Sequence, residues 1–300
     1  MSNTESRPQA TLVVGAGELG LAMLRSLSEW AGAGRLGVLL RPLRDGEADG
    51  SALLRGMSVA IVRADLATET EAGLAAIFRE FGTVICCSGF VGGPGTQRRI
   101  TAAVLRAGVG RYVPWQFGVD YDVVGRGSGQ EVWDEQLDVR DMLRAQSRTR
   151  WVIVSTGMFT SFLFEPSFGV VDLGKGRVHA LGSWDNRLTL TTPEDIGRLT
   201  TAILAQEPPI EDEVVHVAGD TLSYAQLADT VESHLGRPVE RRLWSLDRLR
   251  AAAAAHPGDG MRKYHLAFAR DAGVAWDKER SFNAARGIPV TDVPTWLRAG

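Results

Sequence analysis

Apolar runs alternate with helical patterns through the first two-thirds of this chain. The runs have the length of buried strands, and the patterns between them have that of helices. The predicted strands are Thr11–Val14, Gly37–Leu40, Ser58–Val62, Thr83–Cys87, Arg111–Pro114 and Trp151–Val154. The predicted helices are Leu19–Trp30, Thr70–Phe81, Thr96–Ala107 and Glu131–Ser147. This order favours right-handed βαβ units, and therefore an α/β fold with a doubly wound parallel sheet of Rossmann type.

A glycine-rich turn joins the first predicted strand to the first predicted helix. It is Gly15-Ala16-Gly17-Glu18-Leu19-Gly20, a G-x-G-x-x-G pattern in the strand–turn–helix context that makes it meaningful. The first glycine allows the tight turn, the second admits a pyrophosphate at the helix N-terminus, and the third lets helix and strand pack closely. Arg41 follows the second strand, where NAD enzymes usually carry an acid, and an arginine suits a 2′-phosphate. The sequence therefore predicts an NADP(H) site, with NADP(H) preferred over NAD(H).

Ligands of a doubly wound sheet bind outside the carboxyl ends of its strands. The stretches that follow predicted strands are therefore the candidate site segments: Gly15–Gly20, Arg41–Arg44, Ala64–Asp65, Ser88–Gly95, Trp115–Asp122 and Ser155–Phe159. S-adenosylmethionine enzymes also carry a glycine-rich turn after the first strand, but Gly20 and Arg41 favour a dinucleotide instead.

The later part of the chain alternates less regularly. A helix is predicted to start here with Thr192 as its N-cap, Pro193 as its first residue and Asp195 closing a capping box. A strand is predicted over Val214–Ala218. A second helix is predicted from Ser223 towards Leu235, and Gly236 ends it. We expect an NADP(H)-binding domain over residues 1–160. Residues 161–300 are expected to form mainly a smaller, substrate-binding lobe, with about 185–220 returning to the nucleotide domain.

The composition and net charge limit the class of protein and the partners to expect. Apolar residues make up 44% and charged residues 23%, as in ordinary soluble domains, and the net charge of −3 gives no reason to expect nucleic acid or a membrane as partner. Met1–Ala10 carries no signal-peptide core, and Cys86 and Cys87 are sequence neighbours that rarely pair with each other. A cytoplasmic protein without a structural disulfide is expected. Its oligomeric state stays open, a homodimer included.

Several catalytic arrangements are absent from the sequence. None of the four tyrosines has a lysine four residues later, so the dyad of typical short-chain dehydrogenases is missing. Ser128 lies in Gly127-Ser128-Gly129, which is too tight for the G-x-S-x-G elbow of hydrolases. The five histidines are scattered without metal-ligand spacing, so no metal site is expected, and His216 within a strand is taken as structural.

The fifth predicted strand and the residues that follow it resemble a family pattern. The segment is Arg111-Tyr112-Val113-Pro114-Trp115-Gln116-Phe117-Gly118, similar to the R-F-x-P-S-E-F-G of isoflavone reductase-like proteins, in the NmrA-like group of atypical short-chain dehydrogenases. Other segments agree in order: the opening V-V-G-A-G-x-x-G, Leu39-Leu40-Arg41, Gln97, Thr192-Pro193-Glu194-Asp195-Ile196-Gly197 and Leu222-Ser223. The resemblance spans nearly the whole chain.

The resemblance implies an NADPH-dependent reductase of small aromatic or polyketide-like compounds, of the kind found in secondary metabolism. Hydride would go to a carbonyl, a conjugated double bond or a benzylic ether. The implied cofactor residues are Gly15, Ala16, Gly17, Glu18, Leu19 and Gly20 at the pyrophosphate, Arg41 and Arg44 at the 2′-phosphate, and Asp65, Ser88, Gly89, Trp115, Gln116, Phe117 and Gln136 further along the site. Gly118 is expected to serve the site, to form a turn that needs an unusual φ, or to do both.

Two departures from the family pattern concern the proton donor. Relatives often carry a lysine in a K-x-x-x-R pattern, where this chain has Gln136 four residues before Arg140. An amide hydrogen-bonds a ribose but releases no proton near neutral pH. Trp115-Gln116 also replaces Ser-Glu. Tyr121 is the leading alternative donor, ahead of Asp122, Asp134 and Glu135, and a bound water or solvent is equally open.

Apolar and aromatic residues cluster on the expected substrate side. The substrate candidates are Phe90, Trp115, Tyr121, Met158, Phe159, Phe162 and Trp184, which suit an aromatic organic substrate. The leading interpretation is therefore the reductase. A dinucleotide-binding redox sensor without turnover stays open because the lysine position is lost, and an isomerase that uses bound cofactor transiently is a third alternative.

Overall fold

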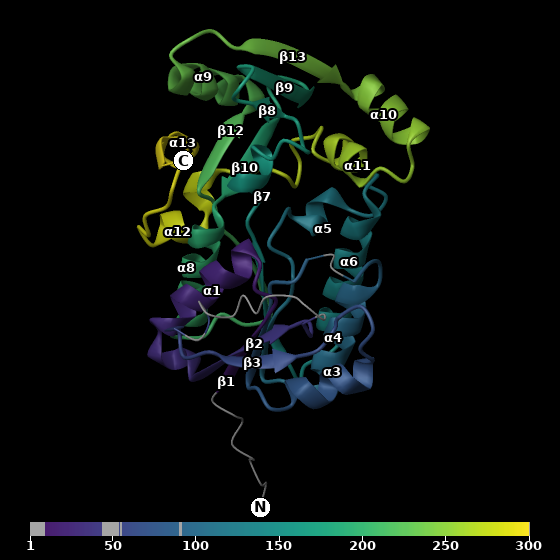
Figure 1. Cartoon of the computed structure of the whole chain (residues 1–300), viewed down its shortest axis with the longest axis vertical. Coiled ribbons are helices and arrows are strands. Elements are labelled where there is room, and N and C mark those ends of the chain that lie inside the picture. The colour runs from purple at the N-terminus through teal and green to yellow at the C-terminus, as the bar shows by residue number, and fades with distance from the viewer. Residues whose placement is uncertain (1–9, 44–53, 55, 90–91, 300) are drawn as a thin grey trace, which may run out of the picture. The chain divides into compact units, whose positions relative to one another are not determined.

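The computed structural model describes residues 10–43, 54, 56–89 and 92–299 (Figure 1). The predicted site residues Arg44 and Phe90 lie outside the described residues. The chain divides into two compact units. The first runs to Gln116 and includes Asp138–Ile153 and Ile196–Val214; the second comprises Phe117–Leu137, Val154–Asp195 and the chain from Val215 on. The second unit thus includes segments that follow two strands of the main sheet. The expected domains, 1–160 and 161–300 with about 185–220 returning to the nucleotide domain, stay a prediction.

One large sheet organises the first unit. Its strands are β1 (Ala10–Val14), β2 (Arg35–Leu40), β3 (Ala60–Arg63), β4 (Thr83–Cys86), β5 (Arg111–Val113), β6 (Arg150–Ser155) and β11 (Glu213–His216). The order is β11-β6-β5-β4-β1-β2-β3, and the paired strands from β3 to β6 are all parallel. The strand order reverses between β1 and β4, which is the switch point where doubly wound folds bind ligands.

Helices flank this sheet: α1 (Glu18–Ser28), the 3₁₀ turn η1 (Ala31–Ala33), α3 (Glu71–Phe78), α4 (Thr96–Ala107), α6 (Glu131–Arg144) and α8 (Pro193–Leu204). Figure 1 shows α3 and α4 side by side, and they pack against each other. Leu12, Val13 and Val14 of β1 are fully buried, as expected for a central strand of a sheet covered on both faces. Burial of these apolar strands provides most of the free energy that holds the unit together.

The second unit contains two three-stranded sheets. One has the order β12 (Asp220–Ser223), β10 (Arg187–Thr191), β7 (Met158–Phe159), and the other β13 (Glu240–Ser245), β9 (Arg177–Gly182), β8 (Val171–Asp172). Its helices are α5 (Tyr121–Val124), α7 (Thr160–Leu163), α9 (Tyr224–Leu235), α10 (Leu246–Ala255), α11 (Gly260–Ala267), η2 (Lys278–Arg280), α12 (Phe282–Ala285) and α13 (Val293–Ala299). Among the described residues, no helix has the length and apolarity needed to cross a membrane.

Local signals set several of these boundaries. Ser223 and Gln226 form a complete capping box at the start of α9, and Gly236 ends the helix in the left-handed conformation, as predicted. Thr192 accepts a hydrogen bond from the Asp195 N–H at 3.1 Å, which confirms the predicted N-cap of α8. The Asp195 carboxylate in turn accepts from the Thr291 N–H at 2.7 Å. This helix start therefore also anchors the C-terminal segment.

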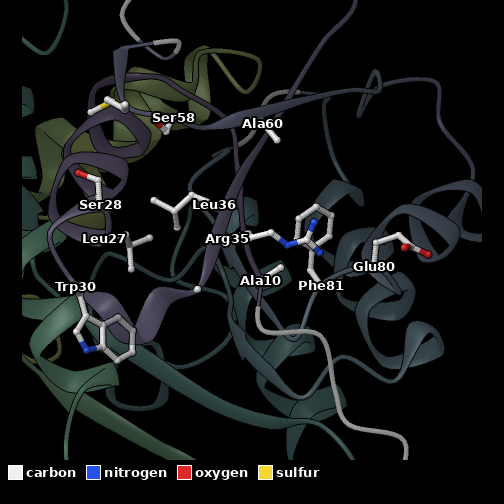
Figure 2. A pocket seen from close by; sticks show the side chains of 12 residues that line it. Ala10, Leu27, Ser28, Trp30, Arg35, Leu36, Ser58, Ala60, Glu80 and Phe81 are labelled. Carbon is white, nitrogen blue, oxygen red and sulfur yellow. The ribbon is translucent and has the colours of Figure 1, made fainter.

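A pocket of about 540 Å³ lies at the amino ends of the first three strands of the large sheet (Figure 2). Ala10, Arg35 and Ala60, the first residues of β1, β2 and β3, line it together with Trp30 and Phe81. Ligands of this fold class bind at the opposite, carboxyl edge. This pocket is therefore separate from the site that the sequence predicts.

Candidate functional site

The glycine turn after β1 has the geometry that its sequence predicts. Gly15 has φ +93°, its N–H donates to the Leu39 carbonyl at 3.0 Å, and a Cβ on it would lie 3.2 Å from Cβ of Ser88. A Cβ on Gly20 would lie 2.1 Å from the carbonyl oxygen of Gly15. The first glycine is thus required by the turn and by the neighbouring strand end. The third is required by the close contact between α1 and the turn.

Gly17, the second glycine, is not crowded by any neighbouring atom. It is the N-cap of α1 with φ −71° and no side-chain cap hydrogen bond. A Cβ at this position would meet no heavy atom within 4 Å. The positive end of the α1 dipole lies at this uncrowded glycine, an arrangement that suits an anion. Of the two residues that follow, Glu18 is exposed and the Leu19 side chain is buried, so Leu19 offers a ligand only its backbone.

Two arginines lie at the carboxyl ends of neighbouring strands. Arg41 directly follows β2 and is exposed, and Arg63 is the last residue of β3. The Arg63 guanidinium donates to the Arg41 carbonyl at 3.0 Å, so the two residues are adjacent. Asp65 just beyond β3 accepts from the Ala67 N–H at 2.8 Å and so shapes the next turn. The carboxyl ends of β2 and β3 therefore each present an arginine, and guanidinium groups suit a phosphate.

The segment after β4 is held between the glycine turn and Trp115. Gln97 of α4, itself buried, donates from Nε2 to the carbonyls of Ser88, at 2.8 Å, and Gly89. A Cβ on Gly89 would lie 3.1 Å from the Trp115 ring. The structure therefore brings Gly15, Ser88, Gly89 and Trp115 together at the switch point, as a site on this edge requires.

Gln116 is held from α6 by a buried arginine. Both Gln116 and Arg140 are fully buried, and the Arg140 Nε–H donates to Gln116 Oε1 at 2.8 Å. The pair fixes the segment directly after Trp115. Gln116 was predicted to contact the cofactor, and that role stays a prediction.

The two cysteines lie at this strand end as buried free thiols. Burial raises the pKa of Cys86 to about 12, with hydrogen bonds from the backbone at Ser88 and Trp115 acting in the opposite direction. Burial also raises the pKa of Cys87. Both thiols are therefore protonated near neutral pH and contribute packing rather than nucleophilic chemistry.

The predicted catalytic residues belong to the second unit. Gln136 is fully buried on α6, and Tyr121, the first residue of α5, packs edge-on against Trp133 with ring centroids 6.0 Å apart. A Cβ on Gly118 would lie 2.7 Å from the Tyr121 hydroxyl oxygen. The φ of Gly118 is not in the left-handed region, so the expectation of an unusual φ is wrong. The space that Tyr121 occupies is the reason for glycine there.

The predicted substrate residues of the second unit are divided between core and partly exposed positions. Met158 is buried, and the Phe162 ring packs on Phe168 with centroids 4.6 Å apart. Phe159 and Trp184 are half-buried. Phe162 and Met158 therefore contribute to the core of this unit, whereas Phe159 and Trp184 keep surface that a ligand can contact. Their substrate roles stay predictions.

The sequence profile of the NmrA-like family matches residues 9–253 of the chain. The chain belongs to the NmrA-like family. A protein of Gibberella moniliformis named an NmrA-like family domain-containing oxidoreductase is 44% identical to it over 295 residues, which cover 96% of each chain. The predicted family resemblance is thereby confirmed, and this NmrA-like protein is an oxidoreductase by class, as predicted.

Solved structures of reductases share the fold of this NmrA-like protein. Isoflavone reductase matches with a TM-score of 0.78 at 18% identity, covering 97% of this chain and 99% of that chain. An NADPH-dependent quinone oxidoreductase of Escherichia coli matches with 0.73 at 18%, covering 96% and 98%. A complex of leucoanthocyanidin reductase from Vitis vinifera with NADPH matches with 0.72 at 18%, covering 89% of each. The Rossmann-type fold is thus confirmed.

Three features of the NmrA-like protein escaped the sequence analysis. Arg63 was not singled out, although its place at the end of the third predicted strand was a usable signal. Arg140 was noted only as part of a spacing pattern, and its bond to Gln116 depends on tertiary packing. His216 was taken as structural, and its Nε2 lies 3.0 Å from the Asp120 carboxylate, which joins the end of β11 to the N-cap of α5.

Proposed function

We propose that this NmrA-like protein is an NADPH-dependent reductase of a small aromatic or polyketide-like compound. The observation that carries the proposal is the glycine turn with its open Gly17 N-cap, adjoined in the same unit by Arg41 and Arg63 at the ends of β2 and β3. The names of similar proteins support it, since they include an oxidoreductase at 44% identity and NADPH complexes of the same fold.

Each part of the cofactor has a counterpart in the first unit. The Gly15–Gly20 turn and the N-terminus of α1 hold the pyrophosphate, and Arg41, assisted by Arg63, holds the 2′-phosphate. Ser88 and Gly89, fixed by Gln97, and Trp115 line the part of the site nearest the switch point. When bound, the cofactor supplies the hydride, and the protein supplies positioning and exclusion of water.

The substrate class follows from the family and from the aromatic side chains. The similar structures include isoflavone reductase and a complex with NADP⁺ and (+)-pinoresinol. Trp115 in the first unit, and Phe159 and Trp184 in the second, are partly exposed aromatic side chains that suit contact with aromatic rings. The proposed reaction is reduction of a carbonyl, a conjugated double bond or a benzylic ether.

The proton that follows the hydride does not come from residue 136. Gln136 is neutral at every pH of interest and fully buried, so it donates no proton. Tyr121 is the candidate donor within the chain, and solvent is the alternative. A solvent proton predicts a solvent isotope effect on turnover that survives Tyr121→Phe.

Turnover with a panel of aromatic ketones, enones and benzylic ethers tests the proposal. NADPH oxidation at 340 nm is expected with at least one class, together with transfer of deuterium from deuterated NADPH to the product. Deuterium in the product together with an equal amount of NADP⁺ requires net reduction, which separates a reductase from an isomerase that uses the cofactor transiently. Binding of NADPH without oxidation across the panel would contradict the proposal.

A second candidate is an NADP(H)-binding redox sensor. The neutral Gln136, at a position where relatives often carry lysine, favours it. A sensor is expected to bind NADPH and NADP⁺ with different affinities, to turn over no substrate, and to retain a stable protein partner in only one redox state. Loss of that partner on exchanging NADPH for NADP⁺ would support this function over the reductase.

A further inference from the structure

The segment before α6 is a glycine-rich loop that the cofactor site does not use. It is Gly125-Arg126-Gly127-Ser128-Gly129, and its three glycines have φ of +73°, +74° and +93°. Only glycine adopts a positive φ readily, so the backbone conformation of this loop requires glycine at these three alternate positions. The loop belongs to the second unit, like the helices α10 and α11.

Contacts to α11 fix this loop in place. A Cβ on Gly129 would lie 3.3 Å from Leu266, and Gln130 donates to the Gly260 carbonyl at 3.2 Å. Lys263 pairs with Glu131 at 2.7 Å, and Arg270 donates to the Ser128 carbonyl at 2.9 Å. These contacts therefore hold the loop in one position.

A pocket of about 390 Å³ lies between the loop, α10 and α11. Its lining is Gly127, Ser128, Gly129, Leu246, Arg250, Leu266, Ala269 and Arg270. The volume falls within the range of small-molecule sites, and the lining combines apolar side chains with two arginines. A ligand with an apolar body and an anionic group matches both halves of this lining.

The charge of the pocket is positive. Within the part of the chain that the structure describes, no carboxylate lies within 4.0 Å of the Arg270 guanidinium, whose one recorded hydrogen bond goes to the Ser128 carbonyl. An arginine has five N–H donors, so most of those of Arg270 are available to a ligand. Arg250 pairs with Asp247 at 3.7 Å, and the Asp247 side chain is 96% exposed, so this interaction is weak.

Carboxylates near the pocket are engaged elsewhere. Asp134 accepts from the Gly127 N–H at 3.0 Å, so that amide is not available to a ligand. Glu131 pairs with Lys263, Asp259 with Arg262, and Asp271 with Arg187. None of these oxygens neutralises Arg270.

We propose that this pocket binds a small organic anion, with its carboxylate, sulfonate or phosphate group on Arg250 and Arg270 and its apolar body on Leu246 and Leu266. The site lies wholly in the second unit and uses no residue of the proposed cofactor site. It does not depend on the proposed function.

Calorimetric titration with 1-naphthoate tests the site, with the uncharged 1-naphthamide as the matched ligand. Wild-type protein is expected to bind naphthoate at one site, at least about tenfold more tightly than the amide. Arg270→Gln is expected to weaken naphthoate binding about tenfold or more while leaving amide binding unchanged. Arg262→Gln, on α11 but outside the lining, is the control and is expected to bind naphthoate as wild type does. Arg250→Gln provides a second variant should Arg270→Gln fold poorly.

Several results would overturn the proposal. Equal affinity for naphthoate and naphthamide, equal affinity in wild type and both arginine variants, or no binding at millimolar naphthoate each contradicts it. Naphthoate bound at the dinucleotide site instead would be displaced by NADPH and weakened by Arg41→Ala. That outcome also contradicts this proposal while leaving the proposed function intact.

Discussion

The proposed selection of NADPH over NADH depends on two side chains at the ends of neighbouring strands. Arg41 is exposed after β2, and Arg63 at the end of β3 bonds to its carbonyl. A phosphate on the ribose offers these side chains charge-assisted hydrogen bonds that a ribose hydroxyl does not. The preference for NADPH is therefore expected to depend on Arg41 more than on the glycine turn, which serves both cofactors.

Arg41→Ala is expected to weaken NADPH binding by about 1.5–3 kcal/mol, the range for losing a hydrogen bond to a charged group, with NADH binding nearly unchanged. Isothermal titration calorimetry measures both. Arg35→Ala is the control, because Arg35 begins the same strand at the opposite edge of the sheet (Figure 2). Equal losses for the two cofactors would remove Arg41 from the 2′-phosphate role.

Gln136→Lys tests whether position 136 still serves proton transfer. A lysine there is expected to add a titrating limb to the pH profile of kcat/KM, because an ammonium releases a proton where an amide cannot. Gln136→Met, which is neutral and of similar size, is expected to leave the shape of the profile unchanged. A lysine variant with the wild-type rate at every pH would show that the position has no part in proton transfer.

Residue-level prediction from sequence succeeded where the signal is local. The roles of Gly15 and Gly20 followed from the pattern of the turn alone, since the contacts that require glycine are with the turn itself and the adjoining strand end. The bond between Gln116 and Arg140 joins positions 24 residues apart and depends on how α6 packs. The reason for Gly118 lay likewise in the place that the Tyr121 side chain takes.

At the scale of an element, two glycines of the turn between β1 and α1 are expected to affect different properties: Gly20 affects stability, and Gly17 affects cofactor binding. Gly20→Ala places a methyl group against the Gly15 carbonyl, where the space is 2.1 Å, and is expected to lower the free energy of unfolding by about 1–3 kcal/mol. Gly17→Ala meets no atom within 4 Å and needs no unusual φ, so it is expected to fold as wild type. Its methyl group faces the space of the pyrophosphate, so NADPH binding is expected to weaken.

Urea denaturation and calorimetry on both variants check this pair. A Gly17→Ala protein that binds NADPH as wild type does would place the pyrophosphate elsewhere. A Gly20→Ala protein with unchanged stability would show that α1 moves away from the turn at little cost.

Element boundaries were predictable where caps and periodicity coincide. The helix α4 has the predicted bounds, Thr96–Ala107, because glycines in the left-handed conformation flank it on both sides. The strand β3 begins at Ala60, two residues later than predicted, because Ser58 has φ +56° and cannot continue a strand. In the second unit, β7 and β8 have two residues each, too few for any pattern to indicate.

At the scale of the whole molecule, the second unit is expected to be sensitive to acid. Burial lowers the pKa of His179 and of His265, whose ring nitrogens lie 2.9 Å and 2.6 Å from the carbonyls of Gly169 and Phe168. The unfolded chain has the ordinary value of about 6.5, so below that pH it binds protons that the folded state resists. The free energy of unfolding is thus expected to fall as pH decreases from about 6.5 towards the lowered folded-state values.

Chemical denaturation between pH 7.5 and about 5 measures this effect. The double variant His179→Gln, His265→Gln is expected to show a flatter dependence over that window. His234→Gln with His256→Gln is the control, because both side chains are exposed. A double variant with the wild-type slope would show that other groups cause the acid sensitivity.

The large sheet was predictable as a whole because most of its strands are short apolar runs, and helices lie between most of them. Its order, with the reversal between β1 and β4, is the one expected of a Rossmann-type fold. The division into units was less predictable. Strands of the sheet can be found from local sequence, but which unit a loop packs with depends on contacts between residues far apart in the chain, as for Phe117–Leu137.

The most direct test of the account is a titration of the purified protein with NADPH and with NADH. NADPH is expected to bind at one site per chain, about tenfold or more tightly than NADH, since one charge-assisted contact to the 2′-phosphate accounts for that difference. Equal affinity for the two nucleotides, or no binding of NADPH at millimolar concentration, would contradict the assignment of the glycine turn and Arg41 as an NADP(H) site.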